Sequence, residues 1–88
     1  MRIRLKISDR DAIIAQARSG IPDEICGLIA GSEDGESKTI EKIYPMINMD
    51  ASAEHFTVDP REHLASIREM RAKGLKPLGN YHSHPNTP

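Results

Sequence analysis

The chain has 88 residues, 38% hydrophobic and 28% charged, with a formal net charge of −1, which allows one folded domain with a small core and argues against disorder. Its basic residues are dispersed and no apolar run reaches the roughly 20 residues of a membrane span, so we expect neither nucleic-acid binding nor membrane insertion. The single cysteine excludes an intrachain disulfide and the N-terminus lacks the apolar region of a signal peptide, which together favour the cytoplasm.

A strand and a helix are predicted first. Residues 1–7 alternate strictly between apolar and basic side chains, and this period of two predicts a half-buried strand. Ser8 is suited to the N-cap of a helix that continues to Arg18, and Gly20 is suited to its C-terminal end. The apolar stripe of this helix consists of Ile13, Ile14 and Ala17.

Three strands are predicted next. The apolar run 25–30 is short and bounded by turn residues, which is typical of a buried central strand. Glu24 lies at the start of this strand, at the edge of the sheet. The Asp-Gly pair at 34–35 signals a hairpin turn into a return strand over residues 38–44. After a loop, the alternation over residues 55–58 predicts a short third strand.

A second helix and a last strand complete the chain. Asp59 is suited to the N-cap, Pro60 to the first helical position, and Gly74 to the C-terminal end of a helix that extends to about residue 73. The apolar face of this helix consists of Leu64, Ile67 and Met70. Pro77 opens the last strand. We therefore predict an α/β (α+β) fold, in which two helices flank a curved mixed sheet.

The residues that suggest chemistry are Glu24 and two histidines near the end of the last strand, His82 and His84. Side chains at i and i+2 of a strand share a face, so both imidazoles can reach one metal ion. Neighbouring strands lie only about 4.8 Å apart, so Glu24 can meet them. Such a set is typical of a hydrolytic zinc site, where a carboxylate takes a proton from the metal-activated water. The alternative is that all three are surface residues.

Other candidate residues favour structural roles. Cys26 is predicted to be a buried thiol, with a soft metal ligand as the less favoured alternative. His55 and His63 have no partner at a ligand spacing, and Ser83 should point away from the metal because the strand alternates.

The two segments 24–31 (EICGLIAG) and 79–85 (GNYHSHP) together resemble the signature of the JAMM (MPN+) zinc metalloprotease family, and are most similar to its small prokaryotic branch. The resemblance implies a cytidine deaminase-like layering of the fold and Zn²⁺ as cofactor. It also implies that His82 and His84 are zinc ligands and that Glu24 is the catalytic general base. The implied reaction is isopeptidase cleavage, the hydrolysis of amide bonds at the C-terminus of ubiquitin-like or sulfur-carrier proteins.

The family's third zinc ligand, an aspartate, and a supporting serine follow the His-x-His-Pro motif and have no counterpart up to Pro88. We therefore expect residues 1–88 to be a single domain's N-terminal portion. The third ligand and the substrate-binding residues stay unknown at this point. Three alternatives remain open: inactivity in isolation, a homo-oligomer in which a partner chain completes the site, and a non-catalytic interaction scaffold of the MPN type.

Overall fold

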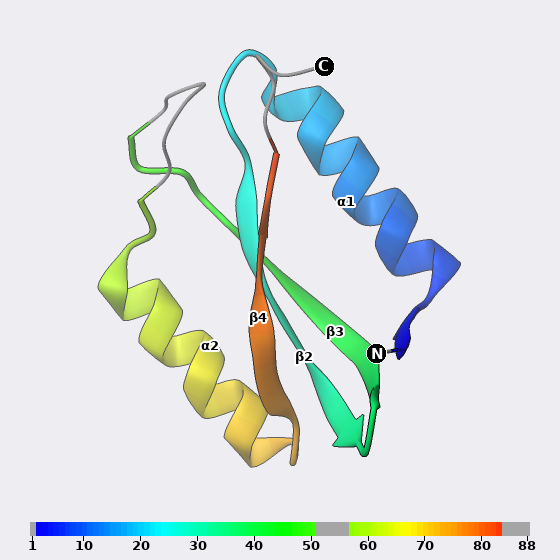
Figure 1. The fold of residues 1–88 in the computed structure, drawn as a ribbon. Coiled ribbons are helices and arrows are strands. Elements are labelled where there is room, and N and C mark those ends of the chain that lie inside the picture. Colours follow the sequence, from blue (N-terminus) through cyan, green and yellow to red (C-terminus); the bar gives the residue numbers. More distant parts are fainter. Residues whose placement is uncertain (1, 51–56, 84–88) are drawn as a thin grey trace.

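The computed structural model describes residues 2–50 and 57–83. In chain order its elements are β1 (Arg2–Leu5), α1 (Ile7–Gly20), β2 (Cys26–Asp34), β3 (Ser37–Met46), α2 (Pro60–Ala72) and β4 (Lys76–His82). The strands form one mixed sheet in the order β1-β3-β2-β4. β1 is parallel to β3, whereas β2 is antiparallel to both β3 and β4. The predicted α+β architecture is confirmed (Figure 1).

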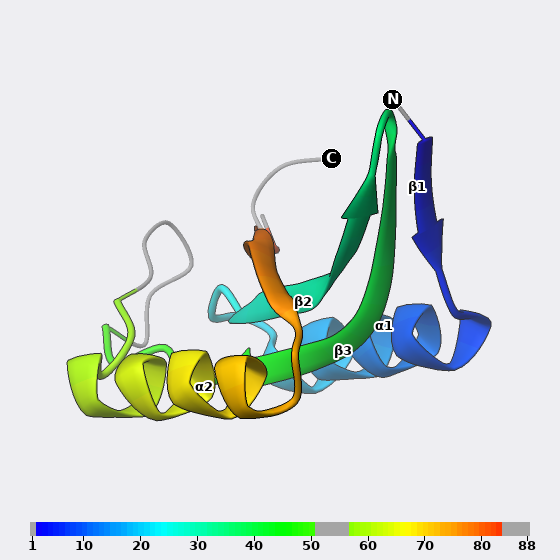
Figure 2. The same cartoon turned by 90° about the horizontal axis from the view of Figure 1, so that it is seen from below.

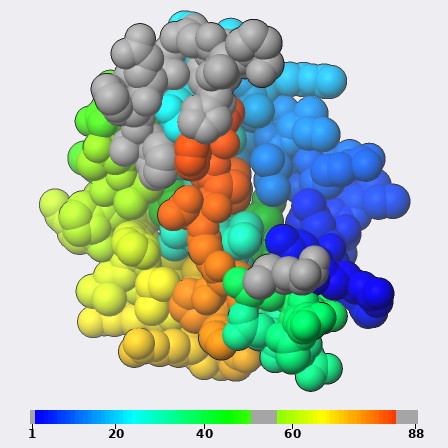
Figure 3. Space-filling model, in the orientation of Figure 1, coloured from blue at the N-terminus to red at the C-terminus, as the bar shows by residue number. Residues whose placement is uncertain are grey.

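The two helices lie on either side of the β2–β4 pair as seen in Figure 1. Figure 2 shows that the sheet is strongly twisted, because the β2–β3 hairpin and β1 rise away from the level of the helices. On the face shown in Figure 3, β4 crosses the surface between the two helices, and most of its residues are exposed. β4 therefore carries its C-terminal end along an accessible surface. Neither described helix is long and apolar enough to cross a bilayer.

The core lies between β2, β3 and α2. β2 is a central strand, as predicted, because it pairs with β3 on one side and β4 on the other. Ala30 of β2 and Met70 of α2 are both 0% exposed and belong to the same buried cluster, so α2 packs against the centre of this strand. The buried residues of this cluster are Cys26, Ala30, Tyr44, Met46 and Met70.

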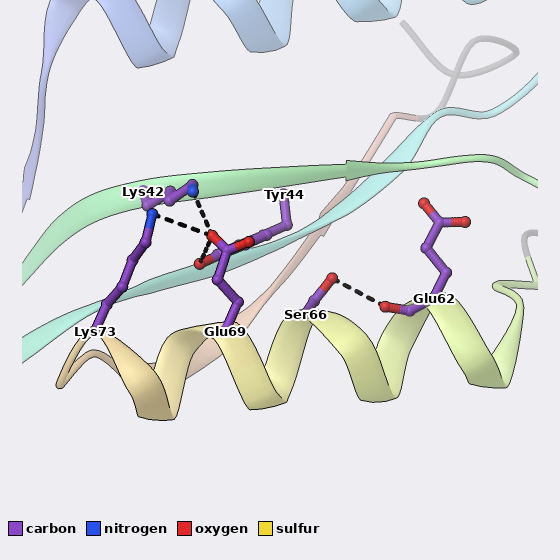
Figure 4. A network of polar contacts seen from close by, with 6 residues as sticks. All are labelled: Lys42, Tyr44, Glu62, Ser66, Glu69 and Lys73. Carbon is purple, nitrogen blue, oxygen red and sulfur yellow. Dashed lines mark hydrogen bonds and ion pairs between the residues drawn. The ribbon is translucent and has the colours of Figure 1, made fainter.

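A polar network also ties α2 to β3 (Figure 4). The Glu69 carboxylate accepts hydrogen bonds from Lys42 and from the Tyr44 hydroxyl, the latter at 3.0 Å, and pairs with Lys73 at 3.3 Å. The ammonium group of Lys42 also lies 4.9 Å from the centre of the Tyr44 ring. Three donors around one carboxylate hold its pKa down at about 2, first of all through the hydrogen bond from Lys42.

The ends of α2 follow the predicted capping residues. The Asp59 carboxylate accepts a hydrogen bond from the Arg61 N–H at 2.8 Å, and Pro60 is the first helical residue. Gly74 has a φ of 71°, the left-handed conformation that lets the chain leave the helix. The predicted apolar face is wrong at one position: Leu64 is 49% exposed. A small residue, Ser66, is buried instead, because α2 turns that side toward the sheet.

The first two elements differ from the prediction in their boundaries and burial. β1 ends at Leu5 and α1 begins at Ile7, so Ser8 is not the N-cap. The cap position is taken by Lys6, whose carbonyl accepts from the Arg10 N–H at 3.0 Å. All four β1 residues are exposed and α1 has no buried residue. The predicted half-buried strand is wrong in this respect, because β1 is an edge strand whose one partner among the described residues is β3.

Of the next two predictions, the hairpin is confirmed and the third strand is not. Gly35 has a φ of 58° in the turn between β2 and β3, which confirms the predicted hairpin. The predicted strand at 55–58 is wrong at Thr57 and Val58, which belong to no strand, and residues 55 and 56 lie outside the described residues. Thr57 instead closes a loop: its carbonyl accepts from the Met49 N–H at 2.8 Å.

Candidate active site

Glu24 and His82 meet where β2 and β4 end. The register pairs Cys26 with His82, and Glu24 comes two residues before Cys26, so its side chain returns to the same side of the sheet. The Nδ1 atom of His82 lies 2.7 Å from Oε1 of Glu24. The Glu24 residue is 2% exposed, whereas the His82 side chain is 33% exposed. The structure therefore brings together a buried carboxylate and an accessible imidazole. His84 lies outside the described residues.

Glu24 and Ile25 precede the first residue of β2, so the regular strand pairing does not include them. Their backbone is held instead by hydrogen bonds with Asn48 and Ser83. The Asn48 amide donates a hydrogen bond to the Glu24 carbonyl at 2.8 Å. The Ser83 hydroxyl accepts from the Ile25 N–H at 2.9 Å, and the Ser83 N–H donates to the Ile25 carbonyl at 3.0 Å. These contacts extend the sheet by two residues and place the carboxylate of Glu24 at its rim.

A second set of contacts joins α1 to the same strand ends. The Tyr81 hydroxyl donates to Oε1 of Gln16 at 2.7 Å, and Nε2 of Gln16 donates to the Cys26 carbonyl at 3.1 Å. The Tyr81 ring lies directly over Gly27, its partner in the β2–β4 register, where a β-carbon would collide with it. Burial raises the pKa of Tyr81 to about 12, so its hydroxyl stays a hydrogen-bond donor at neutral pH.

Cys26 has the environment of a structural thiol. It is 1% exposed, and its sulfur lies 3.9 Å from the Met46 carbonyl. Burial raises its pKa, and the negative charges of Glu24 and Glu62 raise it further. A protonated, buried thiol is a poor metal ligand, in keeping with the structural role expected for this residue. His63, on α2, is exposed.

The donor atoms at the site are of the kinds that zinc accepts, imidazole nitrogen and carboxylate oxygen. With Nδ1 of His82 facing Glu24 at 2.7 Å, a metal held by this histidine would use Nε2. Within residues 2–50 and 57–83, no three histidine, cysteine, aspartate or glutamate side chains gather as a metal-binding group. The described residues thus fit a zinc ion in chemistry and supply one of the predicted ligands.

Residues 7–88 match the family of prokaryotic homologs of the JAB domain. The chain belongs to this family. The match covers both helices, the whole site and all strands except β1, and it confirms the resemblance to the small prokaryotic branch of the JAMM family.

Two curated relatives and one solved structure show how this chain compares with other proteins. It is 32% identical to a desampylase of Haloferax volcanii over 98% of the chain and 64% of the relative. It is 36% identical to a CysO-cysteine peptidase of Mycobacterium tuberculosis, over 88% of the chain and 51% of the relative. A solution structure of a Desulfitobacterium hafniense protein superposes with a TM-score of 0.86 at 45% identity, covering 98% of this chain and 59% of the other. The chain thus spans between about half and two thirds of these proteins.

Sequence reasoning did not predict the parts played by Asn48 and Gln16. Asn48 follows β3 among turn-forming residues, where asparagine is common for local reasons. Gln16 lies on a helix whose predicted stripe pointed to its apolar neighbours instead. Both residues contact partners that are far away in the sequence. Periodicity and capping patterns depend on neighbouring residues, so they could not indicate these contacts.

Proposed function

We propose that this chain carries the base and part of the metal site of a zinc-dependent isopeptidase. Its substrate would be a ubiquitin-like or sulfur-carrier protein, joined through its C-terminal glycine to an amine. The observation that carries the proposal is the 2.7 Å contact between buried Glu24 and His82, placed at the rim of the sheet. Membership of the JAB family, and the relatives named desampylase and CysO-cysteine peptidase, support the reaction class and the substrate class.

In this proposal the zinc ion would be held by His82 and His84, and its charge would acidify water and polarise the scissile carbonyl. Glu24 supplies the proton transfers. In the proposal its carboxylate, which lies 2.7 Å from Nδ1 of His82 in the metal-free structure, takes a proton from the attacking water. The same carboxyl group then gives this proton to the departing amine. The burial of Glu24 keeps bulk water from competing for the proton.

Glu24→Gln tests the assignment, because the amide oxygen can still accept from His82 whereas the side chain no longer takes a proton. We expect kcat on a carrier–lysine or carrier–cysteine conjugate to fall about 10²- to 10⁴-fold, the usual contribution of a general base. Zinc content, measured by mass spectrometry, should not change. Glu36→Gln, at the exposed β2–β3 turn, is the matched control and should cleave at the normal rate.

A Glu24→Gln protein that cleaved normally at full zinc occupancy would remove Glu24 from the mechanism. A wild-type protein that bound zinc and cleaved no such conjugate would instead favour the non-catalytic scaffold.

A further inference from the structure

Glu24 depends on another residue for its position. It is 2% exposed, yet it lies two residues before β2 and is not held by regular strand pairing. If the β2–β3 register that pairs Cys26 with Met46 continued, Glu24 would lie opposite Asn48. The Asn48 side chain takes the place of that main-chain pairing, because Nδ2 donates to the Glu24 carbonyl at 2.8 Å.

The other end of the same amide closes the loop that follows β3. Oδ1 of Asn48 accepts from the Asp50 N–H and the Thr57 N–H, both at 3.1 Å. One short side chain therefore joins three backbone segments and needs both a donor and an acceptor. Aspartate has the same shape, but when ionised it can only accept. Asn48 thus couples the loop to the backbone of Glu24 through its donor group.

We propose that Asn48 is a positioning residue for Glu24, an inference that rests on the proposed function. Asn48 holds the Glu24 carbonyl from the β3 side, and Ser83 holds Ile25 from the β4 side. With the Asn48 donor removed, the Glu24 carbonyl loses its hydrogen bond from the β3 side, and we expect the Glu24 carboxylate to move from its place 2.7 Å from His82. A displacement of about 1 Å in a catalytic group costs up to about 10²-fold in rate.

The test compares Asn48→Asp with Thr57→Val in the full-length protein. Asn48→Asp keeps the acceptor that closes the loop but turns a negative oxygen toward the Glu24 carbonyl. Thr57→Val removes only the hydrogen bond from the Thr57 hydroxyl to Asp50, at 2.7 Å, and serves as the control for a weakened loop. Two quantities are measured for each protein: kcat and KM on a carrier conjugate, and the Nδ1–H resonance of His82 in the metal-free protein.

We expect Asn48→Asp to lower kcat about 10- to 100-fold with KM and zinc content unchanged, and to lose the hydrogen-bonded Nδ1–H resonance of His82. Thr57→Val should keep both. An Asn48→Asp protein that matched Thr57→Val in both measurements would overturn the proposal, and so would a fall in kcat with the His82 resonance intact.

The two readouts also separate this inference from the proposed function. If the wild-type protein cleaves no conjugate, the isopeptidase proposal fails, and the His82 resonance alone decides the role of Asn48. If Asn48→Asp does not fold, Asn48→Ser replaces it, because the shorter hydroxyl does not span the distance to both partners at once. The same two criteria then apply.

Discussion

Gly27→Ala is expected to destabilise the protein through a collision at the strand end that supports the candidate site. Gly27 is buried, and its missing β-carbon is what allows the Tyr81 ring to approach β2 this closely. An alanine there would force the ring away. Because the Tyr81 hydroxyl donates to Gln16 at 2.7 Å, the displaced ring would also lose this hydrogen bond, and Gln16 would lose its support for the bond to the Cys26 carbonyl.

The magnitude follows from three opposing contributions. Overpacking of a tight site costs about 1–3 kcal/mol. Loss of the hydrogen bond between Tyr81 and Gln16 costs about 0.5–1.5 kcal/mol. Replacing glycine by alanine restricts the unfolded chain, which returns about 0.4–1 kcal/mol. The net expectation is that Gly27→Ala lowers the free energy of unfolding by about 0.5–4 kcal/mol, and the middle of this range is a large part of the stability of a small domain.

The assay is urea unfolding followed by circular dichroism, on Gly27→Ala, Tyr81→Ala and the double variant. If the ring is what the new methyl group meets, Gly27→Ala should cost at least about 0.5 kcal/mol less when Tyr81 is already alanine, because contacting residues couple by about 0.5–3 kcal/mol. Equal costs in the two backgrounds would refute the steric reasoning, since the penalty would then come from the strand itself.

Two further predictions concern titrating groups. The pKa of Glu69 is lowered to about 2, chiefly by its hydrogen bond from Lys42 and then by that from Tyr44, so the carboxylate stabilises the folded state above about pH 4.5 and this contribution is lost as the pH falls toward 2. Glu69→Gln should therefore flatten the dependence of unfolding free energy on pH between 4.5 and 2, and an unchanged slope would show that the network contributes nothing. Burial raises the pKa of Cys26, as does the charge of Glu24, so iodoacetamide at pH 8 should label the folded protein at least tenfold more slowly than the urea-unfolded protein. Equal labelling rates would contradict the buried thiol.

The sequence alone determined the elements whose signals are local. The cap of α2 involves Asp59 and the residue two positions later, so neighbouring residues suffice to specify it. The apolar run of β2 required burial on both faces, and a central strand is where a sheet provides it. The hypothesis of a zinc site also came from residue type, because imidazole and carboxylate are common at such sites and the spacing of the two histidines suits one metal ion. It stays a prediction.

Only the tertiary structure decided how these parts are held. The bond between Ile25 and the Ser83 hydroxyl joins residues 58 positions apart, and that between Asn48 and Glu24 joins residues 24 apart. Strand register sets such contacts, and register results from the packing of the whole sheet rather than from any one segment. The exposure of β1 has the same origin: its alternating pattern indicates two faces, but whether another layer covers one of them depends on where the helices pack.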